Sequence, residues 1–455
     1  MTHATSAPRS SFMPMCIIAL LFFIFGFVTW LNGALIPFLQ VVCQLSDPQA
    51  LMIASCFYFA YVVMALPMAM ILEKVGYQYS MVLGLSIIAL GLLGFIPAAL
   101  LQEFWIFLLA QFVIGSGLTI LQTAANPYVV NVGPTSSAAA RIAIMGLLNK
   151  GAGILAPVLF TAWVLGGFSD INLTLINEMP AQQQQLQIES MAHQLITPYV
   201  GMAIALLILA SGLSRFSLPD LALVASTENN EAYAGEANQG YIGKSTIWQF
   251  PQLVLGAIAL FFYVGVEVIA GDTIGLYGAS IGVANATTLT SYTMAFMVVG
   301  YILGLVCIPR FVSQSTALRL SATIGFVISI ALLISSNEQS QISQLLWGWT
   351  GIATLPNSVA LIALLGLANA MVWPTLWPLA LAELGRFTAK GSAILIMGIA
   401  GGALMPLIYG HLAQSSSNQQ AYWILLPGYL IIGFYAFYGY AMRNWNGKHE
   451  GQTPT

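Results

Sequence analysis

Charged side chains are scarce in this sequence of 455 residues: aspartate, glutamate, lysine and arginine together make up 6% of it. In a soluble globular protein about a quarter of the residues are charged. Hydrophobic residues account for 58%, so water cannot be the main solvent around the folded chain. The composition therefore excludes an ordinary soluble protein and predicts one embedded in a lipid bilayer.

Other absences exclude classes of function. The four cysteines, Cys16, Cys43, Cys56 and Cys307, show no C-x-x-C spacing, which favours packing over redox or metal chemistry. The formal net charge is −3 and no basic patch is present, so nucleic acid is not an expected partner. Without an H-E-x-x-H or G-x-S-x-G motif, we expect neither an enzyme nor a bound cofactor.

Long apolar runs are what the sequence does contain. A helix needs about 20 apolar residues to cross a bilayer, and the first run, from Pro14 to about Gln40, is too long for a cleaved signal peptide. The expected fold class is an all-α polytopic membrane protein. Twelve transmembrane helices are predicted near residues 14–40, 50–73, 80–101, 103–130, 141–167, 194–215, 250–278, 289–312, 317–336, 357–382, 389–413 and 420–443.

A polar segment divides the twelve predicted helices into two sets of six. Residues 216–247 are rich in Glu, Asn, Gly and Ser and predict a cytoplasmic linker. We therefore expect an N-terminal six-helix bundle over residues 1–215. A C-terminal six-helix bundle with a short cytoplasmic tail is expected over residues 248–455.

Lysine and arginine predict the orientation of the helices. Eleven of the twelve basic residues fall in loops on one side of the predicted bundle, whereas the alternate loops hold acids such as Asp47 and Glu103. Basic residues in short loops stay in the cytoplasm. Both termini are therefore expected to be cytoplasmic, and the exception to the pattern is Lys150.

Lys150 is predicted to lie near the middle of the membrane. It follows Arg141 by nine positions, which on a continuous helix places it about 13 Å deeper. A lysine there costs roughly 2.5 to 3.5 kcal/mol and usually faces a watery cavity or an acidic partner. We favour a role in substrate binding or coupling, with a structural ion pair as the alternative.

Two acids, Glu267 and Asp272, are embedded in the apolar run 250–278. Because they are five positions apart, roughly 140° around a helix, they need not share a face. Our hypothesis is that Glu267 exchanges a proton or holds Na⁺ as the protein changes conformation. Asp272 either contributes to coupling or gating, or meets external water. The sequence leaves open whether either acid pairs with Lys150.

Amide side chains are the candidates for binding a polar solute. Gln122 and Asn126 are four positions apart and project from one face of a helix. Their donors and acceptors match the hydroxyl groups of a sugar without the cost of burying another charge. The alternative is that they join helices by hydrogen bonds.

Further candidates lie on two other predicted helices. Asn32 lies in the run 14–40, and Asn369 lies with Trp373 in the run 357–382. An indole can stack on the apolar face of a sugar ring and donate one hydrogen bond. An interfacial or packing role is the alternative for the tryptophan.

Several segments together resemble the major facilitator superfamily and, within it, the fucose, glucose and galactose permease family. They are FGFVTWLNGALIPFLQ, LQTAANPYVVNVGP, RIAIMGLLNKGAGILAP, FFYVGVEV and PLALAELGRFTAKGSAILIMGIAGGALMPLIYG. The resemblance implies two pseudosymmetric six-helix bundles, alternating access, a central sugar site and import coupled to H⁺ or Na⁺. It also implies a bacterial inner membrane, and Asn149 matches a sugar-site asparagine of the family.

The sequence departs from the fucose permeases at two positions. Those proteins carry acids where this chain has Gly33 and Gln122, so Lys150 and Glu267 become the expected places for coupling. We expect a monomer in the lipid bilayer that imports a hexose, glucose or galactose. The alternatives are a carrier of an amino sugar or an acidic sugar, an uncoupled sugar uniporter, and a non-transporting sugar sensor.

Overall fold

The computed structural model describes residues 12–131, 138–164, 176, 179–216, 244–308, 310–384 and 387–445. The regular structure in these ranges is helical. Twelve helical spans within them are long and apolar enough to cross a membrane. The predicted all-α polytopic fold is therefore confirmed, whereas most of the predicted linker lies outside the described residues.

The first bundle comprises six of these spans. Its helices are α1 (Phe12–Trp30), α2 (Asn32–Val42), α3 (Asp47–Leu101), α4 (Phe104–Asn131), α5 (Ala138–Val164), α7 (Ala181–Gln194) and α8 (Ile196–Arg215). The two helices predicted near 50–73 and 80–101 run into each other as α3, and the chain changes direction at Gly76, whose φ is 78°. Glycine suits this position because it adopts positive φ without steric cost. Helix α7, which lies within the same span as α8, was not predicted.

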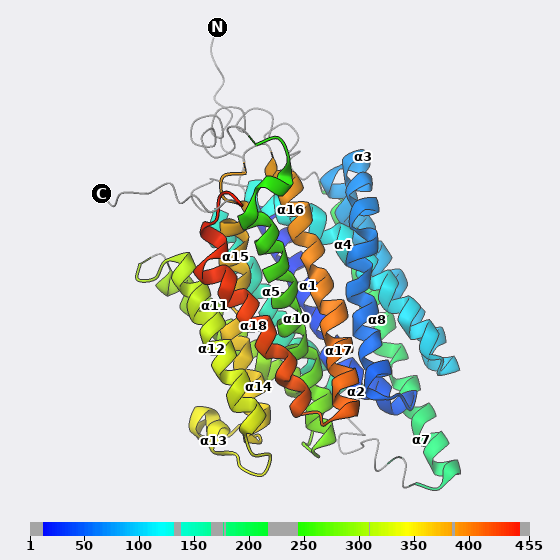
Figure 1. Cartoon of the computed structure of the whole chain (residues 1–455). Helices are drawn as coiled ribbons and strands as arrows, with labels where there is room; N and C mark the ends of the chain where they lie inside the picture. The colour runs from blue at the N-terminus through cyan, green and yellow to red at the C-terminus, as the bar shows by residue number, and fades with distance from the viewer. Residues whose placement is uncertain are drawn as a thin grey trace.

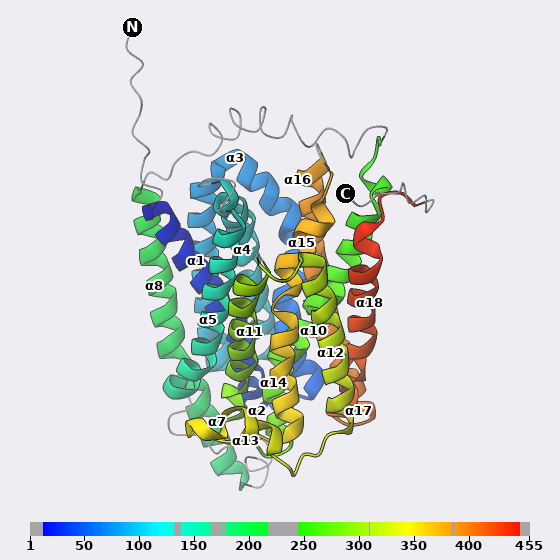
Figure 2. The same ribbon diagram turned by 90° about the vertical axis from the view of Figure 1, so that its left-hand side faces the viewer.

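The second bundle comprises the other six spans. Its helices are α10 (Pro251–Ser280), α11 (Leu289–Cys307), α12 (Gln314–Ile334), α13 (Gln341–Trp347), α14 (Asn357–Asn369), α15 (Val372–Leu381), α16 (Thr388–Met397), α17 (Gly401–Ser415) and α18 (Leu425–Phe437), with the 3₁₀ turn η3 (Ala286–Thr288) before α11. The short helix α13 was not predicted. Figures 1 and 2 show the long helices of both bundles running side by side.

The two ends of the bundles differ in charge. One end of the molecule, which we call the basic end, holds a basic residue at the end of each of three spans: Lys74, Arg141 and Arg215. Asp47 and Glu103 lie at the opposite, acidic end. Helices α7 and α13 also lie toward the acidic end, whereas α16 begins at the basic end (Figure 1). These five residues are thus distributed between the two ends in the way that the sequence predicted, whereas Arg9, Arg386 and Lys448 lie outside the described residues.

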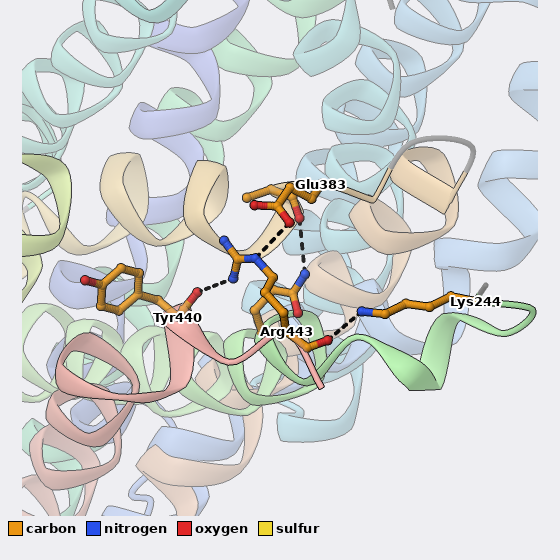
Figure 3. Close-up of polar contacts among 6 residues, drawn as sticks. Lys244, Glu383, Tyr440 and Arg443 are labelled. Atoms are coloured by element: carbon orange, nitrogen blue, oxygen red, sulfur yellow. Dashed lines mark hydrogen bonds and ion pairs between the residues drawn. The ribbon is translucent and has the colours of Figure 1, made fainter. Parts of the chain in front are cut away.

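A cluster at the basic end ties together segments of the second bundle. Arg443, after α18, places its Nε 3.1 Å from Glu383 Oε2, just after α15, and its Nη1 donates to the carbonyl of Tyr440 at 2.7 Å. Lys244, before α10, donates to the carbonyl of Arg443 (Figure 3). Partial burial and the adjacent guanidinium lower the pKa of Lys244. The cluster therefore fixes where α10 begins relative to the end of α18.

Contacts between the bundles follow three pairs of helices: α5 with α11, α2 with α10, and α3 with α17. Backbones approach closely at the second pair, because a Cβ added to Gly33 of α2 would lie 2.9 Å from the carbonyl oxygen of Gly271 on α10. Small residues permit such approaches between membrane helices. The interface between the bundles is where the candidate functional residues gather.

Candidate functional site

A buried ion pair joins the two bundles. Lys150 Nζ, on α5, lies 2.6 Å from Glu267 Oε1, on α10, and the two side chains are 10% and 8% exposed. The sequence left the partner of Lys150 open, and the structure identifies it as Glu267. An ion pair compensates two charges that would each be costly to bury alone. The pair therefore holds α5 and α10 together at mid-depth in this conformation.

Trp30 completes the surroundings of the lysine. Its ring centroid lies 4.3 Å from Lys150 Nζ, within the range at which a cation is attracted to the face of an indole. Trp30 is the last residue of α1 and is 3% exposed. The cation thus contacts an aromatic ring of its own bundle and a carboxylate of the other bundle.

Asp272 does not join this pair. It lies farther along α10, where it is fully buried, and neither carboxylate oxygen has a hydrogen-bond partner among the described residues. The alternative in which Asp272 meets external water is wrong for this conformation, because α10 is covered by α2, α11 and α17. The structure therefore separates the two acids into one that is paired and one that is isolated.

A small cavity of about 10 Å³ lies between the bundles. It is lined by Tyr61, Thr119, Gln122, Thr123, Trp373, Ile396 and Ile399. Gln122 Nε2 donates to the hydroxyl of Tyr61 at 2.9 Å. Trp373 stacks on Trp377 with the ring centroids 5.2 Å apart. Amide, hydroxyl and indole groups on a partly apolar wall form the kind of surface that recognises a sugar ring.

Tyr263 connects the cavity with the ion pair. Its ring centroid lies 6.3 Å from that of Trp373, and its hydroxyl interacts with the carboxylate of Glu267, one turn further along α10. Tyr263 therefore lies between Trp373 at the cavity wall and the carboxylate of the ion pair.

The predicted amides do not all lie at the cavity. Asn32 accepts a hydrogen bond from Gln111 at 2.7 Å, and Asn369 accepts one from the hydroxyl of Tyr429 at 2.8 Å. Both asparagines are buried, so in this conformation they join helices within their own bundles. The structure brings Gln122 and Trp373 together and keeps Asn32 and Asn369 apart from them.

Two other predicted residues differ in what can be described. Asn149 donates to the carbonyl of Phe22 at 3.4 Å and is partly exposed. The side chain of Asn126 lies outside the described part of the structure. Asn149 immediately precedes Lys150, so it lies on the same turn of α5 as the ion pair.

Sequence reasoning missed several residues of this region. Thr119 and Thr123 lie on the same face of α4 as Gln122, and their spacing of three and four positions could have identified them. Tyr61, Tyr263 and Trp30 gave no such signal, because aromatic residues at these spacings are equally typical of packing between helices.

The acidic end is closed by contacts between the bundles. Thr161 Oγ1 lies 2.7 Å from Thr287 Oγ1 of η3, and the Ser291 hydroxyl donates to the carbonyl of Ile154 at 2.7 Å. A Cβ added to Gly410 of α17 would lie 2.9 Å from the side chain of Leu51 on α3. These contacts lie nearer the acidic end than the ion pair does. The paired charges are therefore sealed from that side.

Comparisons with known proteins agree with this architecture. A glucose/galactose transporter of Brucella abortus (strain 2308) is 32% identical over 440 residues, which cover 96% of each chain. An L-fucose-proton symporter of Escherichia coli (strain K12) is 27% identical over 418 residues, 90% of this chain and 89% of the other.

Solved structures show the same fold. The crystal structure of the transporter FucP in the outward conformation superposes with a TM-score of 0.68 at 24% identity, covering 94% of this chain and 99% of the other. The inward open xylose transporter XylE from Escherichia coli superposes with a TM-score of 0.65 at 13% identity, covering 94% and 96%. Fold and relatives are those of transporters, not enzymes. With the Major Facilitator Superfamily matched over residues 18–396, the chain belongs to that superfamily.

Proposed function

We propose that the protein imports a hexose, glucose or galactose, across a bacterial inner membrane by alternating access, coupled to a cation gradient. The observation that carries the proposal is the group of side chains that Gln122, Tyr61 and Trp373 present between the bundles, an amide, a hydroxyl and an indole around a cavity of about 10 Å³ that must widen to admit a sugar. The names of the relatives, glucose/galactose transporter and L-fucose-proton symporter, support the same substrate class.

The expected orientation follows from charge. Lys74, Arg141 and Arg215 lie at the basic end, and basic residues near the ends of membrane spans remain in the cytoplasm. With the basic end in the cytoplasm, the closed acidic end faces outward. The conformation is then one that is sealed on the outside, with the sugar site between the bundles.

The state of Lys150 favours a neutral sugar over an acidic one. Its ammonium group already lies 2.6 Å from the carboxylate of Glu267. A sugar carboxylate would have to displace that partner and leave Glu267 buried without its cation, which is costly. Competition by uronates for uptake tests this alternative, and strong competition would favour the acidic sugar.

The decisive experiment is uptake of radiolabelled glucose and galactose into proteoliposomes of the purified protein. Either a proton gradient, a sodium gradient or neither is imposed. Accumulation under one gradient identifies a symporter and its ion, whereas equilibration without accumulation indicates a uniporter. Saturable binding without flux would contradict the proposal and favour a sensor.

A further inference from the structure

Asp272 is an acid that is buried without a hydrogen-bond partner among the described residues. Its side chain on α10 is 0% exposed, and both carboxylate oxygens lack a hydrogen-bond partner within the described part of the chain. Buried polar groups are nearly always hydrogen-bonded. A buried carboxylate with no partner is therefore an exception that requires a physical explanation.

The nearby cation does not neutralise this acid. Lys150 is paired with Glu267 at 2.6 Å, so its charge is already compensated. Glu267 on the same helix lies close enough to act electrostatically on Asp272, and Asp272 in turn acts on Tyr58 of α3. The adjoining helices α2 and α11 contribute neutral groups, such as Gly33 and Thr290, at this level. A second negative charge here would be uncompensated and close to the first.

Asp272 lies beside a seam between the bundles. A Cβ added to Gly33 of α2 would lie 2.9 Å from the carbonyl oxygen of Gly271, and one added to Gly275 would lie 3.0 Å from the carbonyl oxygen of Gly33. Asp272 lies between these two glycines of α10. Helix α2 belongs to the first bundle and α10 to the second, so a relative movement of the bundles would open the contact that lies next to Asp272 in the sequence.

We propose that Asp272 binds the coupling proton and that the seam between α2 and α10 closes only when this carboxyl group is protonated. The proton comes from water at the acidic end and forms an O–H bond on the Asp272 carboxylate. Closure then buries a neutral group, which costs far less than burying a lone carboxylate. The inference rests on the proposed function, since it assigns the coupling ion of that transport.

The Lys150–Glu267 pair has a different task in this scheme. It stays neutral as a unit and holds the bundles together, so Glu267 is not the group that exchanges the proton. When the proton leaves Asp272 toward the basic end after the sugar, the carboxylate is left buried and uncompensated. That state favours reopening of the seam, which returns the empty carrier to the outside.

The first test compares Asp272→Asn with Asp272→Glu and a matched control, Thr273→Ser, in proteoliposomes. Because an amide is neutral at every pH, Asp272→Asn should exchange sugar across the membrane but accumulate none on a proton gradient. Asp272→Glu should retain accumulation. Thr273→Ser, which keeps the hydroxyl that meets Tyr422, should accumulate sugar as the wild type does. Accumulation by Asp272→Asn, or accumulation on a sodium gradient instead, would overturn the inference.

The second test does not depend on transport. Thr161→Cys and Thr287→Cys place two thiols across the closed acidic end, where the native hydroxyls are 2.7 Å apart. The four native cysteines are replaced by serine in this variant. The rate of disulfide formation reports closure. The same cysteine pair in the Asp272→Asn background corrects for titration of the thiols. The ratio of the cross-linking rate with native Asp272 to the rate in the Asp272→Asn background should rise as the pH falls.

The two tests separate the inference from the proposed function. If the ratio of the cross-linking rates, measured without and with Asp272→Asn, does not change with pH, proton binding at Asp272 is refuted even if the wild type imports sugar. Absence of uptake by the wild type would refute the proposed function, while the cross-linking ratio still decides whether Asp272 controls closure.

Discussion

Lys150 and Glu267 lie 2.6 Å apart although 117 positions separate them in the sequence and they belong to different bundles. Trp30 caps the lysine at 4.3 Å. The attraction between α5 and α10 at mid-depth is therefore electrostatic, and the lysine also contacts an aromatic ring of its own bundle. If the bundles moved relative to each other so that α5 and α10 separated, the two charges would have to separate as well.

Removing either charge of this pair should destabilise the protein, and removing both should restore much of the loss. Lys150→Met leaves the Glu267 carboxylate buried without its cation, and Glu267→Gln leaves the Lys150 ammonium group buried without its anion. Breaking a buried pair costs about 3 to 5 kcal/mol, more than replacing the pair with neutral groups. Thermal unfolding in detergent of both single variants and the double variant measures the coupling free energy.

Glu383→Gln is the control for that cycle, because it also removes one partner of an ion pair. Glu383 and Arg443 are 50% and 34% exposed, so the loss should be under about 1 kcal/mol. Equal losses at the two sites, or a double variant as unstable as the sum of the single ones, would contradict the buried pair described above.

Gly33→Val should prevent closure of the acidic end. The added Cβ would meet Thr290 Oγ1 at 2.0 Å and the carbonyl of Gly271 at 2.9 Å, so α2 and α10 could not approach as they do here. We expect sugar binding by the purified protein to persist while uptake is lost. Gly151→Ala is the control, since nothing lies within 4 Å of its Cβ position. Uptake by Gly33→Val at the wild-type rate would show that the seam is not essential.

Trp373→Ala and Gln122→Ala should weaken sugar binding without preventing folding. Both side chains line the cavity between the bundles, and each contact to a sugar is worth about 1 kcal/mol, which corresponds to roughly a fivefold rise in KM. Initial rates of uptake measure KM and kcat separately. Trp423→Ala, at a residue that is 49% exposed, should leave KM unchanged. An unchanged KM in both cavity variants would place the sugar elsewhere.

A disulfide between Thr161→Cys and Thr287→Cys should stop transport reversibly. The two hydroxyls lie 2.7 Å apart across the acidic end, a separation that suits a bridge between cysteines. Oxidation should abolish uptake and reduction should restore it, as followed in one batch of proteoliposomes. A single Thr161→Cys variant treated in the same way is the control and should transport throughout. Full uptake after complete cross-linking would mean that the acidic end need not open.

The sequence determined the class of protein, the twelve spans and the position of Lys150 near the middle of its span, because hydrophobic runs and isolated charges are local properties of the chain. It missed the helices α7 and α13, because these polar segments carry no strong periodicity. The two spans expected near residues 50–73 and 80–101 are both present, on either side of the kink at Gly76.

Only the tertiary structure decided which charges and amides meet. Lys150 could have paired with Glu267 or Asp272, and helical periodicity does not fix how α10 is rotated against α5. In the structure α2 and α10 approach closely at Gly33, Gly271 and Gly275, Glu267 faces the lysine, and Asp272 is left without a partner among the described residues. Gln122 and Asn369 are both membrane amides, but only the packing of helices places one at a cavity and the other against Tyr429.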